Sequence, residues 1–570
     1  MFGLHIADVL VLGLYLFGMA AIGVWSARKV RTSADFFMPR RFGKAMMTMF
    51  AFGAGTHSDQ AGVVASKSYS VGLSGIWYQW LWLPVTPFYW LIAPVFRRFR
   101  AITTGNVFEA RYNLSVAMLY AVVGMLNLSV NIGLMLRVSG EMISASTGQV
   151  LSANTVIAVM TAIFVIYGVA GGLAAAIITD FIQGILTIVF SFLLLPLIMN
   201  AVGGMEGIRA AIDDPGRLSL VAPADIGVFY ITVIALNALV GIVTQPHTMA
   251  NCAAGKTEME GRVGWMFGNM IKRICTIPWC LTGVAAIVYF EAADRIVEAD
   301  QVFGTVAGDF LPKILPGVLG VFIAALLASV MSSCDAFMIS SSALFTENIY
   351  RRLAPDRKPG HYVGVGRIAA VVVVSGGVAF AYWLPGVVKG LEMFWMVSAM
   401  MGIAFWLGLF WRRTTVAGAW ATTLVSFGVV LFTSRIAFGE FVLWDFNAGS
   451  VQYLPSFMLQ QGELSVPWRM VLYLSSGLVA GIVVSLLTKP VAEEKLDAFY
   501  ALVRTPVTPG EQVQAPCTLP AGAVVPPPKK IFPKSNLEIA VPTRTSVLGF
   551  LAGWGCVAVI VLIVYVIARG

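Results

Sequence analysis

The feature that most constrains this chain is the recurrence of apolar runs that are long enough to cross a lipid bilayer. A helix needs about 20 predominantly apolar residues to span the hydrocarbon core. Of the 570 residues, 58% are apolar and only 12% are charged, whereas a soluble domain has about 25% charged residues. A soluble multidomain protein is therefore excluded, and we predict an all-α polytopic membrane protein with about 14 transmembrane helices. The apolar runs fall near residues 6–26, 46–66, 75–96, 114–137, 153–170, 176–200, 226–249, 264–290, 314–343, 365–385, 390–410, 415–434, 470–488 and 546–568.

Lysine and arginine gather in the loops that follow odd-numbered runs. Arg28 and Lys29 follow the first run and Arg97 and Arg98 follow the third, whereas the loop 141–152 has neither residue type. Basic loops face the cytoplasm, so we predict that the N-terminus is outside. An even number of crossings puts the C-terminus outside too, in a multi-pass protein of the cell (inner or plasma) membrane. The net charge of +9 is an orientation signal and does not indicate a nucleic-acid partner.

Two of the apolar runs contain residues that interrupt a helix. Gly53 and Gly55 stand before a polar cluster in the second run, and Gln245-Pro246-His247 closes the seventh. Broken membrane helices free backbone carbonyls that hold ions and solutes at the midplane of transporters. A simple loop that ends a short helix is the alternative for the first interruption. The polar cluster of the second run is Thr56, His57, Ser58, Asp59 and Gln60.

The two interruptions lie five runs apart, which predicts two inverted five-helix repeats. The proline-rich stretch that precedes the last run is expected to be a flexible cytoplasmic linker, with docking of a regulatory partner as the alternative. The six cysteines have no metal-ligand spacing and are interpreted as packing residues. The expected organisation is a first helix and loop at 1–45, repeats at 46–200 and 225–411, two additional helices at 412–490, the linker at 491–545 and a final helix at 546–570.

Serine residues recur on one face of the ninth run, next to an acidic residue. Ser329, Ser332 and Ser333 share that face because they are three and four residues apart, and Asp335 stands two residues after Ser333. Hydroxyls together with a freed carbonyl make an all-oxygen site that suits a hard, singly charged cation. Serines that bond their own helix or allow close helix packing are the alternative. Asp335 favours the cation.

Asp180 lies within the sixth run, in the stretch Gly171-Gly172…Thr179-Asp180…Gln183. A carboxylate at the centre of a membrane helix costs about 2.5–3.5 kcal/mol on insertion scales. It therefore needs a counter-charge, which is either a lysine of this chain or a transported cation.

These motifs lead to a known family. The chain resembles the sodium:solute symporter family, which includes sodium/proline and sodium/sugar cotransporters, over residues 6–488. The resemblance implies a LeuT-type fold, an outside N-terminus and sodium-coupled uptake. It rests on the stretch 171–183, Tyr69-Ser-Val-Gly-Leu-Ser74-Gly75, Gln245-Pro-His247, Met331-Ser-Ser333 leading to Ile349-Tyr350, and Phe410-Trp-Arg-Arg-Thr414.

The resemblance also implies two cation sites. The main sodium site would use carbonyls of Gly53, Thr56 and Ser329 and hydroxyls of Ser332 and Ser333. A second site would fall on Asp180, Ser332 and Asp335, where the family more often has serine than Asp335. The carboxylate would supply an oxygen and leaves proton participation open. Sodium would be the coupling ion, with no organic cofactor.

For the solute, the sugar-transporting branch of the family matches polar residues at four positions, which are Gln60, Gln79, Asn237 and Lys272. Four polar groups in an apolar pocket weakly favour a sugar, a polyol or a sugar acid. The branch's gating aromatic falls on Val240, however, so an amino acid or organic acid is an alternative. Lys272 has the alternative interpretation of a residue that snorkels from a helix end.

Two other function classes are alternatives to a symporter. A membrane enzyme would need catalytic groups such as His57 with Asp59, or His247, but no Gly-x-Ser-x-Gly or His-Glu-x-x-His motif occurs in the chain. A transporter-like sensor would signal through partners. The expected partners are sodium, a small polar solute and the bilayer, and the expected assembly is a monomer or a loose homodimer.

Overall fold

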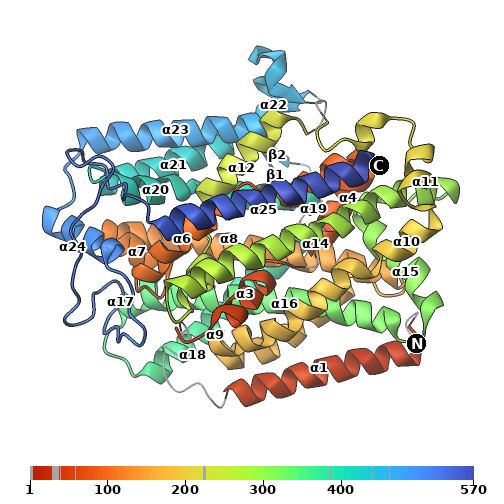
Figure 1. The fold of residues 1–570 in the computed structure, drawn as a ribbon, viewed down its shortest axis with the longest axis horizontal. Helices are drawn as coiled ribbons and strands as arrows, with labels where there is room; N and C mark the ends of the chain where they lie inside the picture. The colour runs from red at the N-terminus through yellow and green to blue at the C-terminus, as the bar shows by residue number, and fades with distance from the viewer. Residues whose placement is uncertain are drawn as a thin grey trace.

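The chain forms a bundle of long helices with two small two-stranded sheets. The structure is a computed structural model that describes residues 4–27, 38, 40–57, 59–222, 226–383, 387–438, 441–460 and 462–569. The predicted basic residues Arg28 and Lys29, and Ser58 of the polar cluster, lie outside the described residues. Most long helices run side by side along one direction (Figure 1). The beginning of α1 and the end of α25 lie at the same end of the bundle (Figure 1).

The helices of the first half follow the predicted runs closely. They are α1 (Ile6–Ala27), α3 (Lys44–Gly53), α4 (Asp59–Val71), α5 (Trp77–Trp80), α6 (Thr86–Arg98), α7 (Thr104–Arg111), α8 (Leu114–Ser146), α9 (Ala153–Leu193), α10 (Leu195–Ala201), α11 (Gly204–Ala211), α12 (Val228–Ile242), α13 (His247–Ala253) and α14 (Glu258–Ala292).

The second half adds the strands, which the sequence did not predict. Its elements are α15 (Val302–Ile314), α16 (Val318–Phe345), α17 (Arg351–Leu353), α18 (Pro359–Trp383), α19 (Val387–Met400), α20 (Gly402–Phe410), α21 (Val416–Phe432), β1 (Arg435–Phe438), β2 (Phe441–Asp445), α22 (Phe446–Gly449), β3 (Leu459–Gln460), β4 (Glu463–Leu464), α23 (Val466–Leu487), α24 (Glu493–Arg504) and α25 (Arg544–Arg569). The antiparallel pairs are β1 with β2 and β3 with β4.

The described residues contain seven helices that are long and apolar enough to cross a membrane, or eight if the bent pair α12–α13 is one span. Four further apolar helices are shorter, with 10–17 residues, at Ile6–Met19, Ala153–Ala162, Trp395–Phe410 and Val416–Phe432. The predicted count of about 14 is therefore not confirmed by helix length and composition. Several of the predicted runs are broken or short, which lowers the number that qualifies as single spans.

Helix α9 differs from the sequence prediction, which placed two separate runs at 153–170 and 176–200. Its 41 residues are helical without a break, and a straight helix of that length would extend about 60 Å. Near its two ends, Ile157 packs against Gly140 of α8, and the ring centroids of Phe190 and Phe303 of α15 lie 5.6 Å apart. The two predicted runs therefore form one continuous helix in the structure.

The predicted linker also differs from expectation, because it is packed against the bundle. Its first part forms α24, and Glu511 then pairs with Arg100 at 2.9 Å and with Arg97 at 3.5 Å. Further along, Glu538 lies 3.2 Å from Arg412. These buried or half-buried ion pairs hold the segment at one end of the bundle, near α6 and α20. The other domain boundaries stay predictions.

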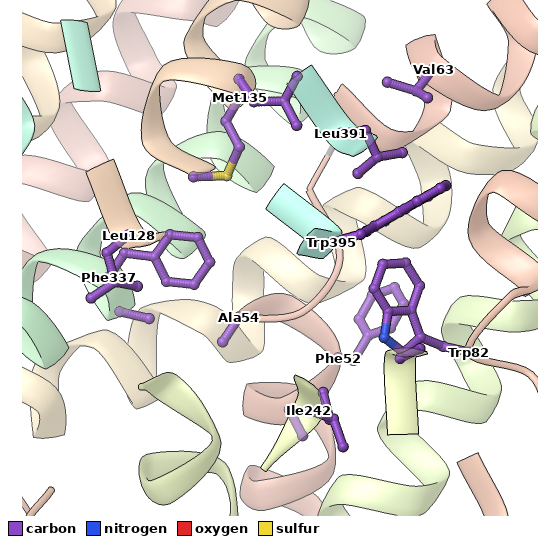
Figure 2. Close-up of a cluster of buried hydrophobic side chains, with 14 of the residues drawn as sticks. Phe52, Ala54, Val63, Trp82, Leu128, Met135, Ile242, Phe337, Leu391 and Trp395 are labelled. Carbon is purple, nitrogen blue, oxygen red and sulfur yellow. The ribbon is translucent and has the colours of Figure 1, made fainter. Parts of the chain in front are cut away.

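The core of the bundle surrounds the interruption between α3 and α4. Helix α14 packs against α3, α4 and α6, and α16 packs against α8, α9 and α18. Figure 2 shows Ala54 of the interruption among apolar side chains that include Phe52, Leu128 and Phe337. Apolar surroundings exclude water, so the polar groups at the interruption must find partners within the protein or bind a ligand.

Candidate ion and solute site

The helix interruption between α3 and α4 is the centre of the candidate site. Helix α3 ends at Gly53 and α4 begins at Asp59, as the glycines predicted. A Cβ atom on Gly53 would lie 3.3 Å from Ser332 Oγ and 3.4 Å from the Asp180 Cβ, so glycine permits a close approach of three helices here. The second predicted interruption is present too, because α12 and α13 meet at an angle of 73°.

Two serine hydroxyls of α16 reach the backbone carbonyls that the interruption frees. Ser333 Oγ donates to the Gly53 carbonyl at 3.2 Å, and Ser329 Oγ donates to the Thr56 carbonyl at 2.9 Å. Ser333 also approaches the Ser329 carbonyl at 3.3 Å. Carbonyl and hydroxyl oxygens from two segments thus converge on one buried point. The residues predicted for the main sodium site lie together, and Ser332, which is beside Gly53, directs its hydroxyl to another group.

Ser332 faces the carboxylate of Asp180 on α9. Its hydroxyl donates to Asp180 Oδ1, while Asp180 Oδ2 has no hydrogen-bond partner among the described residues. Asp335 is also buried on α16, the helix that carries Ser332. Both predicted acidic residues are therefore buried, on α9 and on the facing helix α16. Two carboxylates in an apolar environment attract a cation strongly, because each uncompensated charge is costly there.

Helix α1 adds a residue to this cluster that sequence reasoning missed. The Tyr15 hydroxyl accepts a hydrogen bond from Gln183 Nε2 at 3.3 Å and lies 4.0 Å from the sulfur of Met331. Gln183 was noted only as part of a motif. The polar phenol within an otherwise apolar helix is the signal that would have found Tyr15.

A second buried cluster lies on the other side of the interruption. Lys272 of α14 donates to the Gly55 carbonyl, and Gln60 Nε2 approaches the same carbonyl at 3.3 Å. His57 Nδ1 lies 2.9 Å from Asp59 Oδ1 and 3.2 Å from Gln60 Nε2. Lys272 is only 6% exposed and lies near the middle of α14. The interpretation of Lys272 as a snorkelling residue is therefore wrong.

These groups line a small cavity between α4, α13 and α14. It has a volume of about 50 Å³, which is room for one or two water molecules and not for a hexose. A solute can enter only if the surrounding helices separate. The lining also contains Asn131, Gln245, Asn251 and Asn269, which the prediction of the solute site did not include. Amides at bilayer depth in α8 and α14 are the signal for Asn131 and Asn269.

The four residues predicted for the solute do not line one pocket. Gln60 and Lys272 share the cavity, but Asn237 is bound to the Trp395 carbonyl at 3.2 Å and to the Tyr473 hydroxyl. Asn237 lines a neighbouring cavity with Trp395. Gln79 lines neither cavity, and both polar atoms of its buried amide lack a hydrogen-bond partner among the described residues.

The two small cavities are separated by an aromatic contact. Trp82 lines both of them, and its ring lies 6.1 Å from that of Trp395 in an edge-to-face arrangement. Figure 2 shows the two indoles next to each other. The Lys272 ammonium lies 5.8 Å from the centroid of Trp82.

The comparison with known proteins agrees with this geometry. A family model, the sodium:solute symporter family, matches residues 37–426. The chain is 26% identical to a sodium/glucose cotransporter of Vibrio parahaemolyticus, covering 75% of this chain and 85% of that protein. It is 25% identical to an osmoregulated proline transporter of Bacillus subtilis. That match covers 87% of this chain and 98% of the transporter.

A solved structure shares the fold. It is a substrate-bound, outward-open state of a Na⁺-coupled sialic acid symporter, with a TM-score of 0.70 and 20% identity, and the match covers 85% of this chain and 99% of that chain. The likeness shows a helical membrane transporter fold. The matched family and these neighbours are sodium-coupled transporters and not enzymes.

Proposed function

The chain belongs to the sodium:solute symporter family, and from this premise we propose that it takes up a small polar organic solute with sodium by alternating access. The proposed architecture is a LeuT-type pair of inverted repeats within about 14 membrane crossings, with both termini outside. The interruptions α3–α4 and α12–α13 support the repeats. The common position of the first and last helix ends in Figure 1 supports an even number of crossings.

The observation that carries the proposal is the convergence of α16 serines on the carbonyls of Gly53 and Thr56. Ser329 and Ser333 already touch these carbonyls, at 2.9 and 3.2 Å. A sodium ion placed between the serines and these carbonyls would be coordinated by the carbonyl oxygens that now accept hydrogen bonds from the serine hydroxyls. The ion would thereby hold α16 against the α3–α4 interruption. Sodium occupancy would select one arrangement of these two segments.

The test of the sodium site is the thermal stability of the purified protein in sodium and in choline. We expect sodium to raise the melting temperature, and Ser333→Ala to raise the half-maximal sodium concentration about tenfold, since an interaction with a charged group contributes about 1.5–3 kcal/mol. The matched control is Ser341→Ala on the same helix, because Ser341 donates to the Met338 carbonyl at 2.8 Å, within α16. Equal sodium midpoints in both variants would contradict the proposed site.

We propose that Asp180, Ser332 and Asp335 form a second cation site. The free Asp180 Oδ2 and the nearby charge of Asp335 support this assignment. Each sodium ion that crosses with the solute contributes about 2.3 kcal/mol at 100 mV and about 1.4 kcal/mol for a tenfold gradient. One ion thus supports roughly 500-fold accumulation, and two ions the square of that ratio. Occupation of the second site therefore sets how far the solute is concentrated.

We propose that the solute is a sugar acid or another hydroxylated carboxylate, because of the side chains that line the cavity. Lys272 supplies a positive charge, and Gln60, Asn251 and Asn269 supply amide donors and acceptors. The rings of Trp82 and Trp265 line the same cavity and offer an apolar face to a sugar ring. A neutral sugar would leave the Lys272 charge without an anionic partner. An amino acid or another organic acid shares the carboxylate and is the second candidate.

The solute is tested by a ligand screen in which melting temperatures are compared in sodium and in choline. Sugar acids should stabilise the protein only in sodium, and neutral sugars and polyols should stabilise it less. Failure of all three classes would contradict the assignment of Gln60, Gln79, Asn237 and Lys272. Counterflow in proteoliposomes then separates a transporter from a sensor, because only a transporter exchanges labelled solute.

A further inference from the structure

A long apolar groove lies on the outside of the bundle, far from the interruption. It has a volume of about 1120 Å³ and runs between α6, α12, α20, α23 and α25. Leu236 of α12, Phe410 of α20 and Leu478 of α23 line it and are 55%, 36% and 41% exposed. Figure 1 shows α25 and α23 extending along the bundle with α12 between them. In a membrane-spanning chain, such a groove faces acyl chains.

The groove matches the length of one leaflet. On α6 alone its lining extends from Phe88 to Arg98, which is about 16 Å at 1.5 Å per residue. One leaflet of hydrocarbon is about 15 Å thick. Residues 537 and 539–543 of the C-terminal segment close one end of the groove. The C-terminal segment therefore lines the groove together with the helices, which distinguishes it from a bare gap between helices.

A buried arginine stands at that end of the groove. Arg262 is 7% exposed, and both of its Nη atoms lie 3.2 Å from the hydroxyl of Ser546. Its guanidinium is 5.5 Å from the centroid of Trp90. No carboxylate lies within ion-pair distance of Arg262 among the described residues, because Glu258, one turn away, is held by Arg98 at 2.8 Å. A buried guanidinium with only a hydroxyl partner is under-compensated.

We propose that this groove binds one anionic phospholipid of the cytoplasmic leaflet. The acyl chains lie along α6, α12 and α23, and the phosphate accepts hydrogen bonds from Arg262 and the Ser546 hydroxyl. Positive groups between transmembrane helices on the cytoplasmic side are the recognised environment for anionic headgroups. The bound lipid would connect α25 to α23, two helices that lie outside the proposed repeats.

The test is native mass spectrometry of the full chain in detergent, titrated with phosphatidylglycerol or with phosphatidylcholine that has the same acyl chains. We expect one retained lipid per chain and a preference for phosphatidylglycerol. Arg262→Gln should lower that preference about fivefold, which corresponds to about 1 kcal/mol per basic residue at the membrane surface. Arg413→Gln is the matched control, because Arg413 donates to carbonyls of Leu486 and Thr488 outside the groove.

A second variant keeps the proposal testable if Arg262→Gln does not fold. Leu478→Trp fills the groove from an exposed position on α23 and should reduce retention of both lipids. Leu486→Trp, on the same helix and 57% exposed, lies outside the lining and should retain them. Equal retention of the two lipids by the unmodified chain would overturn the proposal. The proposal would also be overturned if Leu478→Trp changed the oligomeric state without loss of lipid. The groove would then be occupied by a second copy of the chain.

Discussion

Replacing Asp180 with asparagine removes one negative charge from the buried acidic cluster and changes little else. The amide has the same shape, and its oxygen can still accept the hydrogen bond from Ser332. We expect this variant to fold and to lose most of its affinity for the second sodium ion. The sodium dependence of stability and of uptake should weaken together.

The magnitude follows from the burial of the site. Asp180 is fully buried, and Asp335 is 3% exposed. A unit charge pair at 4 Å is worth about 4 kcal/mol at an effective dielectric constant of 20. Desolvation of the ion offsets part of this, so a net loss of about 2 kcal/mol, or roughly 30-fold in affinity, is expected.

The assay is the sodium dependence of the melting temperature, with choline keeping the ionic strength constant. For a dissociation constant of about 10 mM, sodium at about 100 mM adds about 1.4 kcal/mol of stability, and a roughly 30-fold weaker site adds about 0.2 kcal/mol. The control is Asp8→Asn. Asp8 is also buried, but it accepts hydrogen bonds from the backbone of His5 at 2.9 Å and of Gly320 at 2.8 Å.

Asp8→Asn should lower the melting temperature in sodium and in choline alike, because its partners are structural. Asp180→Asn should reduce the difference between the melting temperatures in sodium and in choline. If Asp180→Asn keeps the sodium midpoint of the unmodified protein, the carboxylate does not bind the coupling ion, and the buried cluster has a structural role only. Uptake measurements would then show an unchanged number of sodium ions per solute.

Three further outcomes are expected from other parts of the molecule. Lys272→Met should weaken the affinity for sugar acids at least tenfold, because the ammonium that faces the cavity is lost, and it should leave the sodium midpoint unchanged. Both quantities are measured from melting temperatures. An equal loss of affinity for neutral sugars would contradict the charge argument. Glu511→Ala should leave Arg97 and Arg100 without their carboxylate, at a cost of about 3 kcal/mol, and limited proteolysis should then cleave the segment after α24 faster. Burial raises the pKa of the Cys517 thiol to about 12, so in a variant with no other cysteine a maleimide should label it slowly at pH 8; labelling as fast as in the denatured protein would show that the segment is not packed.

The sequence predicted the helix interruptions, and it predicted that Ser329, Ser333 and Asp180 lie near them, because the causes are local. Gly53 and Gly55 precede a polar cluster within an apolar run, which favours a helix break, and the spacing of Ser329 and Ser333 puts their hydroxyls on one face in any α-helix. Asp180 stands out in the sequence because a carboxylate within a membrane helix is energetically costly. These signals need no knowledge of neighbouring helices, and the structure brings the residues together.

The four residues predicted for the solute do not line one cavity, because their positions depend on how the helices are rotated against one another. Asn237 is polar and lies on an interrupted helix, yet Tyr473 and the Trp395 carbonyl satisfy its amide. Tyr473 belongs to α23, 236 residues away along the chain, and its pairing follows from tertiary packing. The linker shows the same limit, because its proline content indicates a lack of helix but not that Glu511 finds two buried arginines.

In the proposed mechanism, the interruption would couple ion binding to solute binding. The carbonyls of Gly53 and Thr56 face the serines of α16, and the carbonyl of Gly55, between them in the chain, faces Lys272 of α14. An ion on one side and a solute on the other would therefore fix the same short stretch of backbone. Because coupling between two ligands is reciprocal, a solute that orders this stretch must raise sodium affinity by the factor by which sodium raises the affinity for the solute. The two sites need not touch each other for this coupling. The ligand that binds first orders the shared backbone stretch, so the second ligand binds without that loss of conformational entropy.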